Sequence, residues 1–337
     1  MIATGSQALV PAIPGLDSVP FLTNETVFDL SRLPKHLIVI GGGPIGCELG
    51  QAFRRLGARV SIVEMFGIMP KDDPELVEIV RDRLQADGVE LHEHTKVVRV
   101  GGAEGSVTVM TEKDGVERPL EGSTLLVAAG RTPTVDGLDL EAAGVAYDAK
   151  GIRTDARLRT SNRKIYAAGD VAGGYQFTHV AGYHAGIVIR NALFRLPAKV
   201  GYDAVPWVTY TEPELANVGF TEAQAREAHG EIRILRAPFA ENDRAQAERR
   251  MDGLIKAITR PNGRILGAAI VGPHAGELIQ PWVLAISQKL RIGALAQMVA
   301  PYPTLGEIAK RAAGSFYQPK LFSERTKAIV RLLARFG

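Results

Sequence analysis

The spacing of apolar and polar residues changes character about two-thirds of the way along the chain. Up to about residue 200, short apolar runs alternate with stretches of helical periodicity, a pattern typical of a parallel sheet with helices. After residue 206, alternating strands precede a group of helices, which indicates an α+β domain. The strands are expected at residues 207–210, 232–236, 253–259 and 265–271. Helices are expected at residues 276–289, 294–299 and 305–313, and from residue 323.

The first 200 residues predict short elements around one βαβ unit at residues 34–128. Residues 1–3 are strand-like, prolines mark a connector, and a short helix is expected near residues 26–30. Asp114-Gly115 predicts a hairpin turn. The other expected elements are helices at 70–87 and 178–193 and strands at 89–91, 96–100, 106–111, 117–119, 125–129 and 164–168. A charge run at residues 72–75 opens the first helix and needs no function.

One glycine turn provides the clearest chemical signal in the chain. Apolar residues 37–40 lead into it, and a helical stretch and a second apolar run follow it. This order of strand, glycine turn, helix and strand is typical of a dinucleotide-binding site. Gly41 permits a tight turn, Gly43 lets a pyrophosphate approach the backbone, and Gly46 lets the helix pack near the strand. A purely structural turn is the alternative, because glycine-rich turns are common.

Glu64 ends the second apolar run, 23 residues after Gly41. A carboxylate at this place accepts hydrogen bonds from the hydroxyls of a ribose and repels a 2′-phosphate. The sequence therefore favours NAD over NADP. The alternative is a solvent-facing glutamate at the end of a strand.

Composition excludes several classes of function. The chain has 337 residues, of which 46% are hydrophobic, and its 40 basic and 37 acidic residues offer no electrostatic case for nucleic acid. No apolar stretch reaches the roughly 18 residues of a membrane helix. The first residues lack the features of a signal peptide, so a cytoplasmic protein is expected. The basic run near the C-terminus, residues 320–335, is interpreted as a solvated helix face, with a binding role as the alternative.

The single cysteine, Cys47, excludes a disulfide framework and any dithiol chemistry within the chain. A thiol at a helix N-terminus can be reactive, but packing against the sheet is the favoured interpretation. His179, His184 and His274 show no metal-ligand spacing, so no metal site is expected.

Several ordered motifs resemble the class I pyridine nucleotide-disulfide oxidoreductases, flavoproteins that include dihydrolipoamide dehydrogenase, glutathione reductase and mercuric reductase. The resemblance covers essentially the whole chain. The motifs that carry it are Ala3-Thr4-Gly5, Gly41 to Glu48, Gly130-Arg131-Thr132-Pro133, Ala168-Gly169-Asp170, the run at 206–219 and the run at 267–277. The resemblance implies an α/β fold, with a Rossmann-like NAD-binding domain, a partial FAD-binding domain and an α+β dimerisation domain. The implied parts are a residual FAD segment and connector at 1–33, the NAD(P)-binding domain at 34–128, the second FAD part at 129–202 and the dimerisation domain at 203–337.

The resemblance also implies two sets of cofactor-binding residues. The NAD set comprises Gly41, Gly43, Pro44, Ile45, Gly46, Glu48, Glu64, Val97 and Gly130. The FAD set comprises Thr4, Gly5, Arg131, Gly169, Asp170, Thr178 and Ala181. In the family, Glu48 corresponds to an acid near the flavin and Asp170 to a ligand of the ribityl chain. A helix cap is the alternative role of Asp170.

The chain departs from the family pattern in three places. It has neither a second GxGxxG for the ADP half of FAD nor a CxxxxC pair, so a truncated coding sequence or fragment is expected, with a naturally shortened protein as the alternative. The family motif has a proton-handling histidine where this chain has Tyr302, and a tyrosine at this position resembles mercuric reductase. A tyrosine cannot shuttle protons at neutral pH as a histidine does. Glu307 is the catalytic helper of that motif, or else a charge in the first turn of a helix. Pro44 replaces a bulkier residue that covers the flavin in several members.

Together these features predict an FAD-containing, NAD(P)H-dependent oxidoreductase in which NADH passes a hydride to flavin in the intact protein. The alternatives are a non-catalytic NAD-binding and dimerisation module and a cysteine-independent NADH oxidase. A small-molecule electron acceptor is expected, but the sequence does not name it. A homodimer is expected through residues from about 206 to 337. Five aromatic residues there exceed what one small domain must bury, namely Trp207, Trp282, Phe316, Tyr317 and Phe322.

Overall fold

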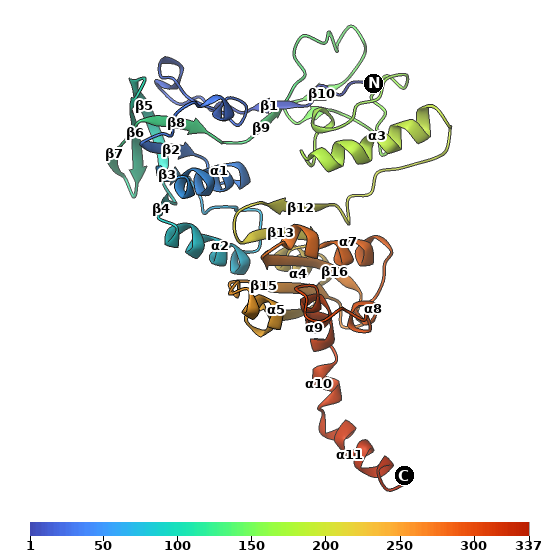
Figure 1. Ribbon diagram of the computed structural model, residues 1–337. Helices are drawn as coiled ribbons and strands as arrows, with labels where there is room; N and C mark the ends of the chain where they lie inside the picture. Colours follow the sequence, from blue (N-terminus) through green and yellow to red (C-terminus); the bar gives the residue numbers. More distant parts are fainter. Residues whose placement is uncertain (337) are drawn as a thin grey trace. The chain divides into compact units, whose positions relative to one another are not determined.

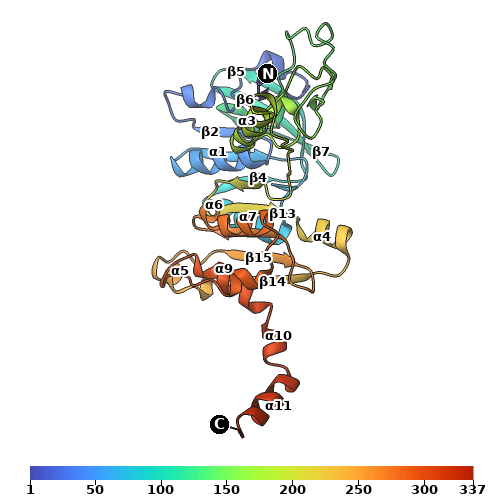
Figure 2. The ribbon, with the colours of Figure 1, turned by 90° about the vertical axis from the view of Figure 1, so that its right-hand side faces the viewer.

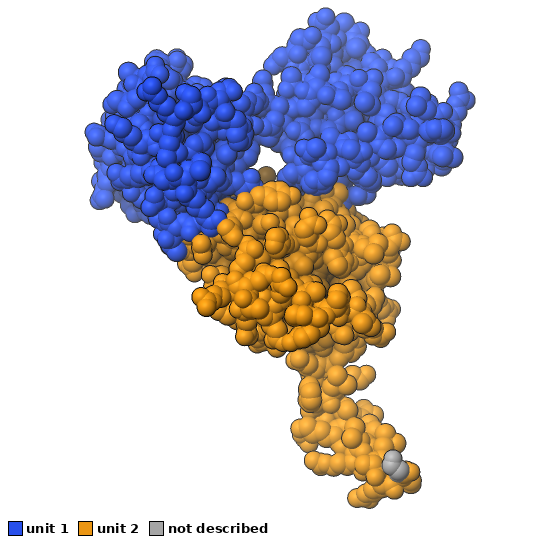
Figure 3. Space-filling model, in the orientation of Figure 1, with its two compact units in different colours: residues 1–69, 84–202 blue, residues 70–83, 203–337 orange. Residues whose placement is uncertain are grey.

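The structure, a computed structural model, describes residues 1–336, so Gly337 of the predicted dimerisation domain lies outside it. The chain forms two compact units, coloured separately in Figure 3. Unit 1 comprises residues 1–69 and 84–202, and unit 2 comprises residues 70–83 and 203–337. Residues 70–83, expected within the NAD-binding part, thus belong to unit 2. The four-part domain division stays a prediction.

A four-stranded parallel sheet lies at the centre of unit 1, in the order β4-β3-β2-β8 (Figure 1). Its strands are β2 (His36–Ile40), β3 (Arg59–Val63), β4 (Val89–His92) and β8 (Thr124–Val127). Helix α1 (Pro44–Arg55) connects β2 to β3 and packs on both. Every residue of β2 is buried, as expected for a central parallel strand with both faces covered. The Rossmann-like unit predicted from the sequence is confirmed.

An antiparallel three-stranded sheet covers this core from one side. It comprises β5 (Lys96–Ala103), β6 (Ser106–Lys113) and β7 (Val116–Gly122). Asp114 and Gly115 join β6 to β7 with positive φ angles of 53° and 76°, which is the geometry of a two-residue hairpin turn. The predicted hairpin is confirmed. Val107 and Val109 of β6 pack against Ile38 in one buried apolar cluster.

The rest of unit 1 has little regular sheet. Strand β1 (Ser6–Ala8) pairs with β9 (Arg131–Pro133), and β10 (Tyr147–Asp148) pairs with β11 (Gly151–Ile152). The strand expected at residues 164–168 is absent from the described structure, because Tyr166 and Ala167 each form only an isolated bridge. Residue 2 is the partner of Ala167, so the strand-like start is likewise a single bridge. Helix α3 (Thr178–Ala192) forms where a helix was predicted. Short 3-10 helices lie at η1 (Leu16–Ser18), η2 (Val27–Asp29) and η3 (Asp170–Ala172).

Unit 2 is built on a five-stranded antiparallel sheet in the order β12-β13-β16-β15-β14 (Figure 2). Its strands are β12 (Pro206–Thr209), β13 (Glu214–Gly219), β14 (Arg233–Pro238), β15 (Leu254–Thr259) and β16 (Ile265–Gly272). The sequence missed β13, because Pro213 precedes it and the polar Asn217 lies within a nearly continuous buried run. The predicted α+β architecture is confirmed.

The helices of unit 2 differ from prediction mainly at their boundaries. Helix α2 (Pro74–Ala86) begins in unit 2, and its last three residues belong to unit 1. The others are α4 (Glu222–His229), η4 (Phe239–Glu241), α5 (Asp243–Ala247), α6 (Ala275–Leu278), α7 (Gln280–Ser287), α8 (Ile292–Ala296), α9 (Glu307–Ser315), α10 (Gln318–Leu321) and α11 (Glu324–Leu333). The helix predicted at 276–289 is split in two, with Pro281 in the first turn of α7, where a missing N–H is tolerated. Helix α2 begins later than predicted, after Asp73, whose backbone and side chain accept hydrogen bonds from its first N–H groups.

Trp282 is fully buried in the main apolar core of unit 2, and Phe316 packs against the same core. The expectation that these aromatic residues exceed what the domain buries alone is therefore wrong for Trp282. Tyr317 and Phe322 are exposed, as that expectation requires. Among the described residues, no helix is long and apolar enough to cross a membrane.

Candidate functional site

The glycine turn after β2 has the close approaches that its sequence predicts. Gly41 has a φ of 112°, and a Cβ atom there would lie 2.4 Å from the Ala128 carbonyl oxygen. A Cβ atom on Gly46 would lie 1.9 Å from the Gly41 carbonyl oxygen, so the first turn of α1 packs directly on the backbone. Gly43 is the N-cap of α1, and a Cβ atom there would meet nothing within 4 Å. The helix N-terminus is thus open above Gly43, where N–H groups can bind an anion.

Glu64 holds the glycine turn through its carboxylate. One carboxylate oxygen accepts a hydrogen bond from the Gly42 N–H at 2.7 Å, and the other accepts one from the Phe66 N–H at 2.9 Å. An ionised carboxylate has about four acceptor positions, so both oxygens retain capacity for ribose hydroxyls. Glu64 therefore has a structural role that the sequence did not indicate, in addition to its predicted role in binding.

The other predicted NAD residues lie around this turn with different surroundings. Pro44 is exposed at the first position of α1, and Glu48 is half-buried in the same helix. Val97, in β5, packs against the apolar core of the unit. Gly130 is exposed after β8, and its carbonyl accepts a hydrogen bond from the Leu9 N–H. Ile45 is half-buried in the first turn of α1. Their contacts with a nucleotide stay predictions.

Cys47 packs inside unit 1. Its side chain is fully buried, and its Sγ lies 3.3 Å from the Gly42 carbonyl oxygen, to which the thiol donates. The favoured interpretation of Cys47 as a packing residue agrees with this position.

A cavity of about 560 Å³ lies elsewhere in unit 1, between the N-terminal segment and α3. Six of the seven predicted FAD residues line it, namely Gly5, Arg131, Gly169, Asp170, Thr178 and Ala181. The seventh, Thr4, donates a hydrogen bond from its hydroxyl to the Thr134 carbonyl oxygen. The other lining residues are Met1, Ala3, Ala168, Gln176 and Ala185, of which Ala3 and Ala168 belong to the family motifs but were not among the predicted site residues. Helical spacing could have found Ala185, which follows Thr178 and Ala181 on one face of α3.

Asp170 is held at the edge of this cavity by a network that spans the unit. Ser6 donates a hydrogen bond to the Asp170 carboxylate at 2.5 Å, and Arg131 Nε donates to the Ser6 hydroxyl at 2.6 Å. A second Arg131 nitrogen donates to the Ser6 carbonyl, and Arg131 Nε lies 3.8 Å from the carboxylate. Asp170 makes no side-chain capping bond to η3, whose N-cap is Gly169. The cap alternative is therefore wrong, and Ser6 is a site residue that the sequence missed.

His184 fixes the glycine turn that leads into the cavity. The buried ring accepts a hydrogen bond at Nδ1 from the Gly169 N–H at 3.2 Å. Because Nδ1 accepts, Nε2 carries the proton and donates to the Tyr202 hydroxyl at 2.9 Å. Burial lowers the pKa of His184, so the ring is neutral at neutral pH. His184 is therefore a core histidine with a structural role.

Tyr302 and Glu307 lie in unit 2, near the start of α9. The Tyr302 hydroxyl donates a hydrogen bond to the Asp243 carboxylate at 2.9 Å, and the side chain is 71% exposed. The Asp243 carboxylate raises the pKa of Tyr302, so the phenol keeps its proton at neutral pH. Glu307 accepts a hydrogen bond from the Thr304 N–H at 3.2 Å, as a charge in the first turn of a helix does. Catalytic roles for both residues stay predictions.

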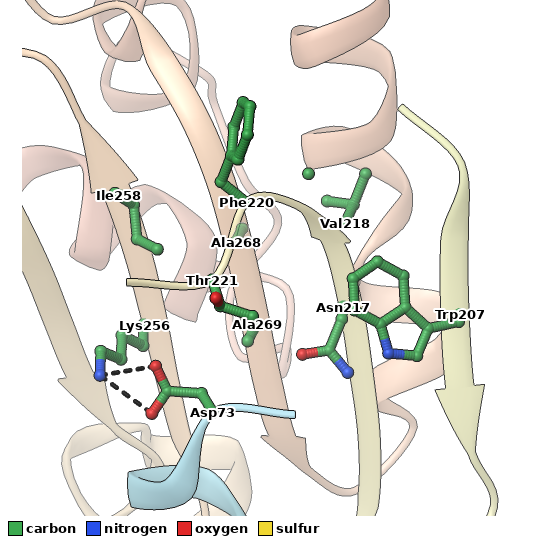
Figure 4. A pocket seen from close by; sticks show the side chains of 11 residues that line it. Asp73, Trp207, Asn217, Val218, Phe220, Thr221, Lys256, Ile258, Ala268 and Ala269 are labelled. Carbon is green, nitrogen blue, oxygen red and sulfur yellow. Dashed lines mark hydrogen bonds and ion pairs between the residues drawn. The ribbon is translucent and has the colours of Figure 1, made fainter. Parts of the chain in front are cut away.

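A second feature of unit 2 is a buried ion cluster around Lys256, of which Figure 4 shows the ion pair between Lys256 and Asp73. The ammonium group is 4% exposed and lies 2.8 Å from carboxylate oxygens of Asp73, Glu75 and Glu222. Hydrogen bonds from Arg236 lower the pKa of Glu75 to about 2. The cavity beside the cluster has about 10 Å³, room for no more than a single water. The charge run at 72–75, which the sequence analysis set aside, therefore anchors this segment to the sheet of unit 2.

Comparisons with known proteins agree with this geometry. Residues 1–185 match the family described as pyridine nucleotide-disulphide oxidoreductase, and residues 205–313 match the dimerisation domain of that family. A mercuric reductase of Bacillus cereus is 39% identical over 319 residues, which are 94% of this chain and 51% of that protein. A dihydrolipoyl dehydrogenase of Bacillus subtilis is 37% identical over 93% of this chain and 67% of that protein. The chain thus spans about half the length of the Bacillus cereus mercuric reductase.

Solved structures show the same fold. The HOCl-induced flavoprotein disulfide reductase RclA from Escherichia coli superposes with a TM-score of 0.84 and 30% sequence identity. That match covers 92% of this chain and 72% of RclA. LpdA from Mycobacterium tuberculosis superposes with a TM-score of 0.85 and 29% identity, over 93% of this chain and 68% of LpdA.

Proposed function

Because this chain belongs to the pyridine nucleotide-disulphide oxidoreductase family, we propose that in the intact protein it is part of an FAD-containing, NADH-dependent oxidoreductase. The observation that carries the proposal is the pair of sites in unit 1, the open glycine turn at α1 and the cavity bordered by Asp170. Relatives named as reductases and dehydrogenases favour this function over a non-catalytic module. We expect the electron acceptor to be a small molecule, whose chemical class the sequence does not name.

The glycine turn would hold the pyrophosphate of NADH. The N–H groups at the start of α1 face open space above Gly43, so an anion can approach them without a side chain intervening. Glu64 would accept hydrogen bonds from the adenosine ribose while it keeps its bond to the Gly42 N–H. A 2′-phosphate beside that carboxylate would meet a like charge, so NADH is preferred over NADPH.

Substituting Glu64 separates its two roles. Glu64→Ala removes the ribose acceptor and releases Gly42, and should weaken NADH binding by about 1–3 kcal/mol. Glu64→Gln keeps one acceptor oxygen, which can still accept from the Gly42 N–H, but loses the bond from the Phe66 N–H and the charge, so it should narrow the difference in affinity between NADH and NADPH. Calorimetric titration of both variants with both nucleotides checks this. An unchanged NADH to NADPH ratio in Glu64→Gln would argue against a ribose contact.

The cavity of unit 1 fits the flavin and ribityl side of FAD. Backbone at Gly5 leaves room for a close approach, and Asp170 offers a carboxylate that Ser6 and Arg131 keep in place. His184 would maintain the Gly169 turn. The sequence holds no second GxGxxG for the ADP half, so the residues present fit only part of the cofactor. When bound, flavin accepts a hydride from a reduced nicotinamide and passes electrons on.

Titration of FAD with the purified full chain tests the flavin site. We expect the flavin fluorescence to change on binding to the native chain, and Asp170→Ala to weaken that response because the ribityl chain loses its carboxylate partner. Gly314→Ala, a substitution with open space around the new Cβ in unit 2, serves as the control. A chain that binds NADH yet leaves flavin fluorescence unaltered would instead support the non-catalytic module.

We also propose a homodimer that forms through the region matching the dimerisation domain, residues 205–313. In the family resemblance, Tyr302 and Glu307 face the flavin site of the partner subunit. The exposure of Tyr302 in the single chain supports such a contact. Its raised pKa means that it would position a substrate by hydrogen bonding rather than exchange protons at neutral pH.

A further inference from the structure

The helix α11 and the residues around it form an exposed amphipathic segment. Figures 1, 2 and 3 show α10 and α11 leading away from the sheet of unit 2. Ser323 caps α11 by accepting a hydrogen bond from the Thr326 N–H, so the helix has a defined start. None of the ten residues of α11 is buried. The segment also lies beyond residues 205–313, so the match to the dimerisation domain does not account for it.

One face of this segment is apolar and uncovered. Ile329, Leu332 and Leu333 follow each other at the i, i+3, i+4 spacing of a single helix face, and Phe336, just past the end of α11, continues the spacing in the sequence. Their exposed fractions run from 48% for Ile329 to 81% for Phe336. In a globular domain such a row is normally buried against a core. Within residues 1–336, no part of the protein covers this row.

The opposite face is basic. Lys327 and Arg331 are spaced four residues apart and therefore lie in one row along the helix, and Arg335 follows at the same spacing in the turn after α11. Residues 320–336 contain five basic residues and one acidic residue, Glu324, which pairs with Lys327 at 2.7 Å. Arg325 lies on the apolar side, four residues before Ile329, where a long side chain can extend to water.

We propose that the segment from Lys320 to Phe336 binds the surface of an anionic phospholipid membrane. A helix with a cationic face and an apolar face lies in the plane of the interface, with its apolar side chains in the acyl boundary and its charges at the phosphates. The ten residues of α11 are too few to span a bilayer, so they lie on it. This binding would bring an NADH-dependent reductase to a membrane surface, a property beyond its proposed chemistry.

Charge favours lipid over a second copy of the chain as the occupant. In a two-fold symmetric contact through the apolar rows, the basic rows of the two copies would face outward, away from the contact. Pairing of that kind covers the apolar row but offers no complementary charge to the basic row. An anionic bilayer instead offers a negative surface and an apolar layer at once, which matches both faces of the helix.

Sedimentation of the full chain with phospholipid vesicles tests the proposal. We expect binding to vesicles of phosphatidylcholine mixed with phosphatidylglycerol, much weaker binding to phosphatidylcholine alone, and loss of binding as salt rises. Replacing both Arg331 and Arg335 with glutamate should weaken vesicle binding by about a hundredfold or more. Each replacement removes a positive charge and adds a negative one, and each charge near an anionic surface changes the affinity by about fivefold. Leu333→Ser with Phe336→Ser should weaken binding without removing its dependence on salt.

The control has the same change in net charge at another surface. Arg163→Glu with Lys164→Glu alters two exposed basic residues of unit 1 and should leave vesicle binding as in the native chain. Equal binding to both kinds of vesicle, or equal losses in the two double variants, would overturn the proposal. Light scattering without lipid tests whether a second copy of the chain covers the apolar row. A molar mass below that of the native chain for Leu333→Ser with Phe336→Ser would assign the row to a second copy and overturn the proposal. Circular dichroism confirms that each variant keeps its helix content.

Discussion

Replacing Lys256 with alanine should lower the free energy of unfolding by about 3–5 kcal/mol, the range for breaking a buried ion pair. The ammonium group is 4% exposed, and its loss would leave Asp73, Glu75 and Glu222 facing one another, with Arg236 and Arg226 to balance part of their charge. Burial by itself would lower the pKa of Lys256, but hydrogen bonds to the three carboxylates raise it, so the charge is present at neutral pH.

Denaturant unfolding followed by circular dichroism measures this effect. Lys327→Ala provides the matched control, because Lys327 pairs with Glu324 on an exposed helix and should cost less than about 1 kcal/mol. Lys256→Met, which keeps most of the side-chain volume, should be as harmful as alanine if charge balance dominates. A cost below 1 kcal/mol for both Lys256 variants would mean that the carboxylates take up protons or water at little expense.

Gly46→Ala should weaken NADH binding by about a hundredfold or more. A Cβ atom at residue 46 would lie 1.9 Å from the Gly41 carbonyl oxygen, so α1 must move away from the turn. That movement displaces the N–H groups that would bind the pyrophosphate, and two lost hydrogen bonds to a charged group are worth about 3–6 kcal/mol. Fluorescence titration of the full chain with NADH measures the loss.

Two further glycines sharpen the test of the turn. Gly43 has a φ of −72° and no atom within 4 Å of a new Cβ, so Gly43→Ala should fold normally and still lose affinity if the pyrophosphate lies against it. Gly314→Ala, in α9, should change neither folding nor affinity. A Gly46→Ala protein that binds NADH as the native chain does would show that the turn is only structural.

The sequence predicted the parts of unit 1 that depend on local pattern. The turn at Gly41 to Gly46 and the hairpin at Asp114 each need backbone conformations that only certain residues adopt easily, so their positions are visible in the sequence. The apolar run at 164–168 looked equally like a strand, but a strand also needs a partner, and its neighbours supply only isolated bridges.

Contacts between residues that lie far apart in the sequence could not be predicted from it. Ser6 and Asp170 are 164 positions apart, and Lys256 and Asp73 are 183 positions apart. Neither pair leaves a periodic signal, because a single serine or a single buried lysine looks like any other polar residue in a strand. The family motifs marked Asp170 but not the residues that hold its carboxylate in place.

The glycine turn at the start of α1 is proposed to be an NADH site. Calorimetric titration of the full native chain with NADH and with NADPH is the most direct test of this site. We expect NADH to bind with a measurable heat and at least severalfold more tightly than NADPH, because Glu64 lies beside the turn. Absence of binding by either nucleotide, or tighter binding of NADPH, would contradict it.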